Sequence, residues 1–230
     1  AGVAIRINAS DIPPVESAEQ LSSIPSINQF LELGADRVVS IIGLSNEPVI
    51  AIGTKNGVVK RISELPEKDS FKIITLSEGD EVIAAANSDE FLFFATTSGQ
   101  VLKFDANSVR PQGLSAGGMQ GIKLAAEDQV VGFGAANDEQ QLITAAEAGD
   151  GLLGAEFGRG KSTLFSEIPK KGRATQGVRV QRFSKADKHL YFAKASQRSE
   201  CCSGDSREAF EASKRDVAGQ SLSFRVIGVH

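Results

Sequence analysis

The residues whose chemistry stands out in this sequence are basic, and they are concentrated in residues 157–198. This stretch holds eleven Lys and Arg residues against Glu167 and Asp187, which gives it a charge of +9. The whole chain of 230 residues carries −4, so the remaining residues carry −13. Positive charge concentrated in this way is typical of a surface that binds a polyanion, and solvated surface charge is the alternative.

Two glycine-spaced segments, residues 110–121 and 170–179, have a pattern suited to phosphate. Each has a basic residue, a glycine, four further residues, a second glycine and then Met or Val. Glycine permits a positive φ and a close approach of the backbone, and flanking basic residues can present both charge and N–H groups to phosphate oxygens. The alternative is a structural loop whose glycines turn the chain.

Residues 155–162 fit a loose phosphate-loop pattern, but the surrounding sequence argues against that function. A phosphate loop needs a buried strand before it and a helix after it, so that backbone N–H groups meet the phosphates. A turn-like Gly149-Asp150-Gly151 precedes this segment, and Pro169 follows too soon for a helix. We expect Gly160 to be a hairpin glycine instead.

Few residues of the types that often serve in catalysis or bind metals occur in this chain. The two histidines are His189 and His230, and the two cysteines are adjacent, a spacing that suits neither a metal site nor a stapling disulfide. We expect Cys201 and Cys202 to be unreactive thiols in a polar loop. We expect no catalytic residue, metal or cofactor. No apolar run reaches the roughly 18 residues of a membrane span and no leader opens the chain, so we expect a cytoplasmic protein.

The elements that must position the basic residues are short β-strands. Runs of four to six β-branched and aromatic residues, bounded by turn residues, are typical of strands, and no sustained helical period occurs. The predicted strands lie at 37–42, 49–52, 58–62, 71–74, 82–84, 91–94, 101–104, 130–133, 178–180, 190–192 and 222–226. The sequence therefore predicts an all-β protein.

Two features recur along these strands. Residues 56–62 (Asn-Gly-Val-Val-Lys-Arg-Ile) match residues 98–104, and residues 159–165 and 1–7 match less closely. A turn glycine marks each of these hairpins, at Gly2, Gly57, Gly99 and Gly160. A second feature follows each hairpin: a turn that contains an aspartate and leads into an apolar run. The aspartates are Asp36, Asp80, Asp128 and Asp187. Two features that keep one order at a spacing of about 50 residues indicate a structural repeat.

Repeats of this length, with about four strands each, are typical of radial β architectures, because each small sheet buries its faces against its neighbours. We expect one domain over residues 1–230, built as a propeller-like disc of about four or five blades. Residue 1 begins within a hairpin, so residues 1–13 are expected to be the remnant of an incomplete first blade in a fragment of something longer. Residues 197–230 form a divergent C-terminal segment.

The repeated Asn-Gly-Val-Val-Lys-Arg hairpin and the glycine-spaced segments at 110–122 and 171–179 carry a family likeness. Together they resemble the C-terminal domain of the A subunit of bacterial type IIA DNA topoisomerases. The resemblance covers nearly the whole chain and weakens after about Ser196. It implies a β-pinwheel, in which neighbouring blades exchange strands, with a basic rim that binds and bends duplex DNA.

The resemblance also implies a role and partners. The domain would not cut DNA, because the DNA-cleaving tyrosine of the family lies in an upstream domain and Tyr191 sits in an apolar strand. Its partners would be duplex DNA, the ATPase B subunit and the rest of the A subunit, in the cytoplasm at the nucleoid. The residues expected to contact phosphates are Lys60, Arg61, Lys103, Arg110, Lys161, Lys170, Lys171, Arg173, Arg179 and Arg182.

Three alternatives remain open from the sequence. Gyrase A subunits resemble the same domain but carry a Gln-Arg-Arg-Gly-Gly-Lys-Gly box for DNA wrapping, and this run is absent from the 230 residues. Its absence favours a topoisomerase IV A subunit over gyrase. The acidic remainder of the chain favours a different class, a propeller that binds proteins and has no role with DNA. An enzyme in its own right is the third class, and no acid/base pair or metal cluster supports it.

Overall fold

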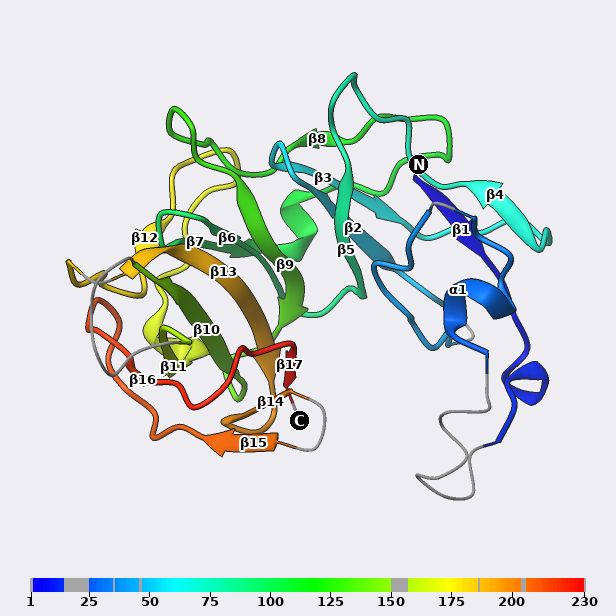
Figure 1. Ribbon diagram of the computed structural model, residues 1–230. Helices are drawn as coiled ribbons and strands as arrows, with labels where there is room; N and C mark the ends of the chain where they lie inside the picture. The colour runs from blue at the N-terminus through cyan, green and yellow to red at the C-terminus, as the bar shows by residue number, and fades with distance from the viewer. Residues whose placement is uncertain are drawn as a thin grey trace.

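The computed structural model describes residues 2–14, 25–34, 36–45, 47–149, 157–185, 187–203 and 206–229. These residues form five antiparallel sheets that follow one another through the molecule (Figure 1). The helical elements are single turns, α1 (Ile27–Phe30) and the 3-10 turns η1 (Ala9–Asp11), η3 (Ala106–Ser108) and η4 (Phe165–Glu167). The prediction of an all-β fold is confirmed.

The first sheet has the two strands β1 (Val3–Ile5) and β4 (Ser70–Lys72). The second has the order β5 (Val82–Asn87), β2 (Ile50–Thr54), β3 (Val58–Ile62), β8 (Met119–Gln120). The third has the order β9 (Val130–Ala136), β6 (Phe91–Thr96), β7 (Gln100–Asp105), β12 (Val178–Arg179). The fourth has the order β13 (Asp187–Ser196), β10 (Gln141–Ala148), β11 (Arg159–Leu164), β16 (Gln220–Ser221). The fifth has the order β15 (Ser206–Ala209), β14 (Glu200–Ser203), β17 (Gly228–Val229).

Each four-stranded sheet is closed by a strand that belongs to the next unit of the chain. After a hairpin such as β6–β7, the chain donates a short strand, β8, to the preceding sheet and then returns with β9 to its own hairpin. The same exchange places β12 on β7, where Val178 pairs with Val101, and β16 on β11. This strand exchange is the arrangement of a β-pinwheel, and the prediction of about four to five blades with an incomplete first blade is confirmed.

The apolar core lies between neighbouring sheets. Strand β6 is buried on both faces, so its consecutive phenylalanines enter two different clusters. Phe94 packs on Phe133 of the third sheet at 4.8 Å between ring centroids, beside residues of the second sheet. Phe93 packs on Phe165 at 5.7 Å, beside residues of the fourth sheet. Each fully buried ring stabilises the fold by roughly 1.5–3 kcal/mol, so β6 fastens three sheets together.

Two of the recurring aspartates, Asp80 and Asp128, support hairpin turns. The carboxylate of Asp80 accepts a hydrogen bond from the backbone N–H of Asn56 at 3.0 Å, and that of Asp128 accepts one from Ser98 at 3.0 Å. Each aspartate therefore satisfies a backbone donor in the hairpin turn of its own sheet. This contact explains why the two sequence features repeat in step.

The prediction of Gly160 as a turn glycine is wrong. Gly158, with φ of +84°, takes the left-handed position held by Gly57 and Gly99 in the other hairpins. Gly160 lies two residues further on, within β11, where it pairs with Ala145. A Cβ at Gly158 would overlap the carbonyl oxygen of Ala146, which explains the need for glycine there. Residues 150–156, including part of the phosphate-loop pattern, lie outside the described residues.

The C-terminal residues keep the order of the repeat although their sequence has diverged. The hairpin β14–β15, the donated strand β16 and the return strand β17 reproduce the topology of the preceding unit. Cys201 is buried in β14 rather than in a polar loop, and burial raises its pKa to about 12. Among the described residues, no helix is long and apolar enough to cross a membrane.

Candidate nucleic-acid interface

Three loops of equal length precede the donated strands and occupy equivalent places. Pro111, Lys170 and Ala212 form isolated parallel bridges to Arg61, Lys103 and Ser162, and each bridge lies eight residues before a donated strand. We call residues 111–118, 170–177 and 212–219 the first, second and third rim loops. Each belongs to one unit and lies against the sheet of the preceding unit.

The rim loops are tied to one another by a repeated backbone hydrogen bond. The N–H groups of Thr75, Lys123 and Arg182, which belong to successive units, meet the carbonyl groups of Ala116, Thr175 and Val217 at 3.3, 3.0 and 3.1 Å. The chain itself leads from each loop through its donated strand to the next of these hydrogen bonds. Residues 75, 123 and 182 and the three loops therefore form one edge across successive sheets, which we call the rim.

Positive charge on the rim is greatest at the second loop. Residues 169–182 contain five basic residues and no acid, and residues 110–123 contain two basic residues and no acid. In the third loop, Lys214 and Arg215 are offset in part by Asp216. Lys170 of the second loop pairs with Asp105 at 3.9 Å, and both side chains are exposed. A backbone edge that carries several long, positively charged side chains suits the phosphates of a polyanion.

The structure places six of the ten expected contact residues on or beside the rim. The side chains of Lys170, Arg179 and Arg182 are 56%, 55% and 61% exposed, and Arg110 and Lys171 are also exposed. Arg173 is half-buried, and its guanidinium donates a hydrogen bond to the carbonyl group of Gln120. These residues can present charge to a ligand that lies along the rim.

Lys60 and Lys161 do not belong to this set, and their assignment as phosphate contacts is corrected. Lys60 is 0% exposed, and its ammonium group donates to the carbonyl groups of Ile73, Leu114 and Ala116, each at 2.8 Å. Lys161 is 3% exposed and donates to the carbonyl groups of Val180 at 3.0 Å and Lys214 at 2.7 Å. Both ammonium groups fasten a rim loop to the sheet beneath it. Burial lowers the pKa of Lys60, and it lowers that of Lys161 to about 8.

Lys103 and Arg61 are also structural. The Lys103 ammonium is 3% exposed, pairs with the carboxylate of Asp138 and lies 4.3 Å from the ring centroid of Phe91. Arg61 is half-buried and donates to the carbonyl groups of Ala106 at 2.6 Å and Val109 at 3.1 Å. Arg61 thereby fixes η3, and Lys103 fixes η4 because its ammonium also donates to the carbonyl group of Phe165 at 3.1 Å. The hairpin pattern misleads because rim loops and 3-10 turns of the following unit cover these side chains.

Lys123 is a rim residue that the sequence reasoning missed. It is exposed, and its backbone N–H makes the hydrogen bond that Arg182 makes in the next unit. The repeat carries the signal, because Ile122-Lys123-Leu124 and Gln181-Arg182-Phe183 stand at equivalent distances from their donated strands. The two residues form corresponding positive points on neighbouring sheets.

A carboxylate of the third rim loop pairs with two arginines of the rim. Asp216 in the third loop pairs with Nε of Arg179 at 3.1 Å and with Nη2 of Arg182 at 3.4 Å. The hydrogen bond from Arg182 lowers the pKa of Asp216, and the neighbouring Arg179 lowers it further. Both guanidinium groups therefore have an internal anion as partner.

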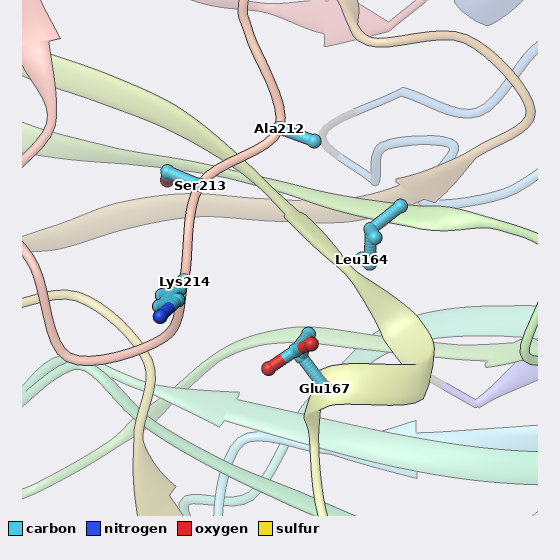
Figure 2. Close-up of a pocket in the computed structure, with 5 residues that line it drawn as sticks. All are labelled: Leu164, Glu167, Ala212, Ser213 and Lys214. Atoms are coloured by element: carbon cyan, nitrogen blue, oxygen red, sulfur yellow. The ribbon is translucent and has the colours of Figure 1, made fainter.

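Small clefts lie where the rim loops meet the sheets. One, of about 110 Å³, is lined by Leu164, Glu167 of η4 and residues 212–214 of the third rim loop (Figure 2). Its counterpart at the second sheet, of about 450 Å³, lies between residues 63–66 and 111–114.

Comparison with known proteins agrees with this architecture. The family model described as "DNA gyrase C-terminal domain, beta-propeller" matches residues 72–89, 90–137 and 152–188. The fold is similar to a solved DNA gyrase A C-terminal domain, with a TM-score of 0.74 at 20% identity over 97% of this chain and 75% of that one. It is also similar to a C-terminal domain of DNA topoisomerase IV, with a TM-score of 0.64 at 21% identity over 82% and 62% of the two chains.

Curated relatives have closer sequences. The chain is 31% identical over 172 residues to the DNA gyrase A protein of Klebsiella oxytoca, and 30% identical over 190 residues to that of Staphylococcus epidermidis. These matches cover 72% and 78% of this chain but 17% and 20% of the relatives, so the chain spans about a fifth of their length. The chain belongs to the family of DNA gyrase C-terminal β-propeller domains, found in the A subunits of bacterial type IIA DNA topoisomerases.

Proposed function

We propose that this domain binds duplex DNA along the rim and bends it, as a non-catalytic part of a type IIA topoisomerase A subunit. The observation that carries the proposal is the run of five basic residues without an acid at residues 169–182, which lies on the rim. The contact set is Arg110, Lys123, Lys170, Lys171, Arg173, Arg179 and Arg182. Compared with the set expected from the sequence, this set omits Lys60, Arg61, Lys103 and Lys161 and adds Lys123.

The proposed contacts position DNA without reading its sequence. Lys and Arg side chains on a backbone edge meet phosphates, which are the same in every sequence. Because the rim crosses successive sheets, a duplex that follows it must change direction from one sheet to the next. The domain would thereby hold one DNA segment at an angle that suits strand passage by the ATPase B subunit and the rest of the A subunit in the bacterial cytoplasm.

The proposal is tested by titrating linear duplex DNA with the 230-residue chain at several salt concentrations. Neutralising about five phosphates gives a slope of log K against log salt of about −4 to −5. The same slope is expected for duplexes of unrelated sequence. Absence of binding at about 50 mM salt, or binding that does not respond to salt, would contradict the proposal.

The same titration tests a second candidate function, that of a propeller that binds proteins. That function is favoured by the loop at residues 63–69, where Glu64, Glu67 and Asp69 are exposed beside the first rim loop. An acidic surface repels DNA and can attract a basic partner protein. A chain that folds but leaves DNA free at low salt would support this candidate.

The type of parent enzyme is a finer proposal. The 230 residues lack the Gln-Arg-Arg-Gly-Gly-Lys-Gly run expected for DNA wrapping, which favours a topoisomerase IV A subunit. The curated relatives named above are gyrase A subunits, which makes gyrase the rival. Intact A and B subunits should be assayed on relaxed and catenated circles. ATP-dependent negative supercoiling would identify gyrase, and decatenation without supercoiling would identify topoisomerase IV.

A further inference from the structure

Asp216 is placed where it can compete with DNA. Its two carboxylate oxygens face Arg179 and Arg182, two residues of the proposed contact set, at 3.1 and 3.4 Å. The arginine side chains are 55% and 61% exposed, so both guanidinium groups can also be reached from solvent. A phosphate that approaches this part of the rim meets two arginines that already share an anion.

The rim loop does not need a carboxylate for its own conformation. Asp216 has φ of +58°, and its backbone N–H donates to the carbonyl group of Val180 at 2.8 Å. In the second rim loop, Ala174 has φ of +62° and makes the equivalent hydrogen bond to Gly121 at 2.7 Å. Gln120 and Lys123 stand beside the second rim loop at the positions that Arg179 and Arg182 hold beside the third. The second loop has alanine at the position of Asp216, so of these two loops only the one beside the arginine pair has a carboxylate there.

We propose that the Asp216 carboxylate occupies the place of a DNA backbone phosphate between Arg179 and Arg182, and that a phosphate displaces it when the domain binds DNA. This inference rests on the proposed DNA-binding function. Exposed ion pairs are weak, so the exchange is inexpensive, and arginine guanidinium groups bind phosphate oxygens with the same paired geometry that they use for carboxylates. Asp216 thus lowers the affinity of the rim for DNA and its response to salt.

The test compares Asp216→Asn with a matched control in duplex-DNA titrations. Asparagine keeps the shape of the side chain and tolerates a positive φ, so the rim loop should keep its conformation. The control is Glu211→Gln, which removes the same charge from an exposed residue five positions earlier. D216N is expected to bind about threefold to tenfold more tightly than wild type, with a slope of log K against log salt steeper by about 0.9. E211Q should change affinity by less than about twofold.

A double-mutant comparison separates displacement from simple charge. In an R179Q/R182Q background, D216N should give no gain in affinity beyond that of E211Q, because the competed groups are gone. Asp216→Gly, which accepts the same φ, provides a second variant if D216N does not fold.

The outcomes distinguish the two proposals. If wild type binds DNA and D216N binds no more tightly than E211Q, or binds less tightly, the displacement of Asp216 is wrong while the DNA-binding function stands. If neither wild type nor D216N binds DNA at low salt, the proposed function itself fails, and the displacement fails with it.

Discussion

Lys60 shows how a single buried cation can organise the fold. Its ammonium group joins Ile73, which follows β4, to Leu114 and Ala116 of the first rim loop. A buried ammonium group is costly to desolvate, and three carbonyl oxygens at 2.8 Å compensate for that cost. Lys161 repeats this contact two sheets further on.

We expect Lys60→Met to lower the free energy of unfolding by about 1–3 kcal/mol, because it removes the ammonium donor that the carbonyl groups of Ile73, Leu114 and Ala116 share. Urea unfolding followed by circular dichroism measures this change. Lys170→Met, at an exposed rim position, is the control and should leave stability within about 0.5 kcal/mol of wild type. Weaker DNA binding by K60M without a loss of stability would contradict a structural role.

The lowered pKa of Lys161 makes a prediction about pH. Its pKa is about 8 in the folded protein and 10.5 in the unfolded chain. Between these values the unfolded chain binds the additional proton, so the contribution of Lys161 to stability rises with pH from about 8 to 10.5, by up to about 3 kcal/mol. Cys201 opposes this rise above pH 9, because its pKa is raised from 9.0 to about 12. Urea unfolding of wild type and Lys161→Met across this range isolates the lysine. Parallel stability curves for the two proteins would contradict the lowered pKa.

At the level of elements, the rim loops depend on the close approach of glycine to the sheet. A Cβ at Gly177 would lie 2.6 Å from the carbonyl carbon of Val101, whereas one at Gly172 in the same loop would meet nothing nearer than 3.9 Å. Gly177→Ala should therefore push the second rim loop away from β7, since backbone cannot yield as a flexible side chain can.

We expect G177A to lower the free energy of unfolding by about 1–3 kcal/mol and to weaken DNA binding, because the loop that carries Lys170 and Lys171 moves. G172A is the matched control and should change stability by less than about 0.5 kcal/mol. Thermal unfolding and DNA titration of both variants test this prediction. Equal stability of the two variants would show that the second loop is not held by this contact.

The repeat can be recognised from the sequence, whereas the strand exchange cannot. Glycine turns and aspartates such as Asp80 and Asp128 mark local hairpin contacts, so their spacing can be read along the chain. The donated strands β8, β12 and β16 have two residues each, too few for any periodic signal. The rim loops that cover Lys60 and Lys161 lead into these strands and come from the following unit, so the hairpin pattern alone predicts an exposed surface for both lysines. The turn glycine of β10–β11 is also predicted wrongly, because Gly158 and Gly160 stand two residues apart and only Gly158 takes the left-handed conformation.

For the whole molecule, the distribution of charge matters more than the net value of −4. The positive charge lies in the units that supply the second rim loop, while the exposed loop at residues 63–69 is acidic. DNA on the rim would therefore feel attraction at one part of the edge and repulsion at the other. Such a contrast can orient the duplex before close contacts form.

We expect the charge reversal K170E/K171E to weaken DNA binding by at least about tenfold for all sequences and to reduce the salt slope by about 2. The control K194E/R198E changes the same charge at exposed residues at the end of β13, in the sheet edge opposite β16. Titration of both variants at several salt concentrations tests the location of the site. An equal loss of affinity in the two variants would indicate general charge rather than the rim.

The exchange of the fourth strand has a mechanical consequence. Each four-stranded sheet is completed by a strand of the following unit. The backbone from Thr75 through the first and second rim loops to Val217 is therefore a continuous series of contacts between neighbouring units. A stiff duplex bent over this edge would exert an outward force on all of these contacts at once. The load would pass along strand hydrogen bonds in shear, and the blades would resist separation together instead of opening one at a time.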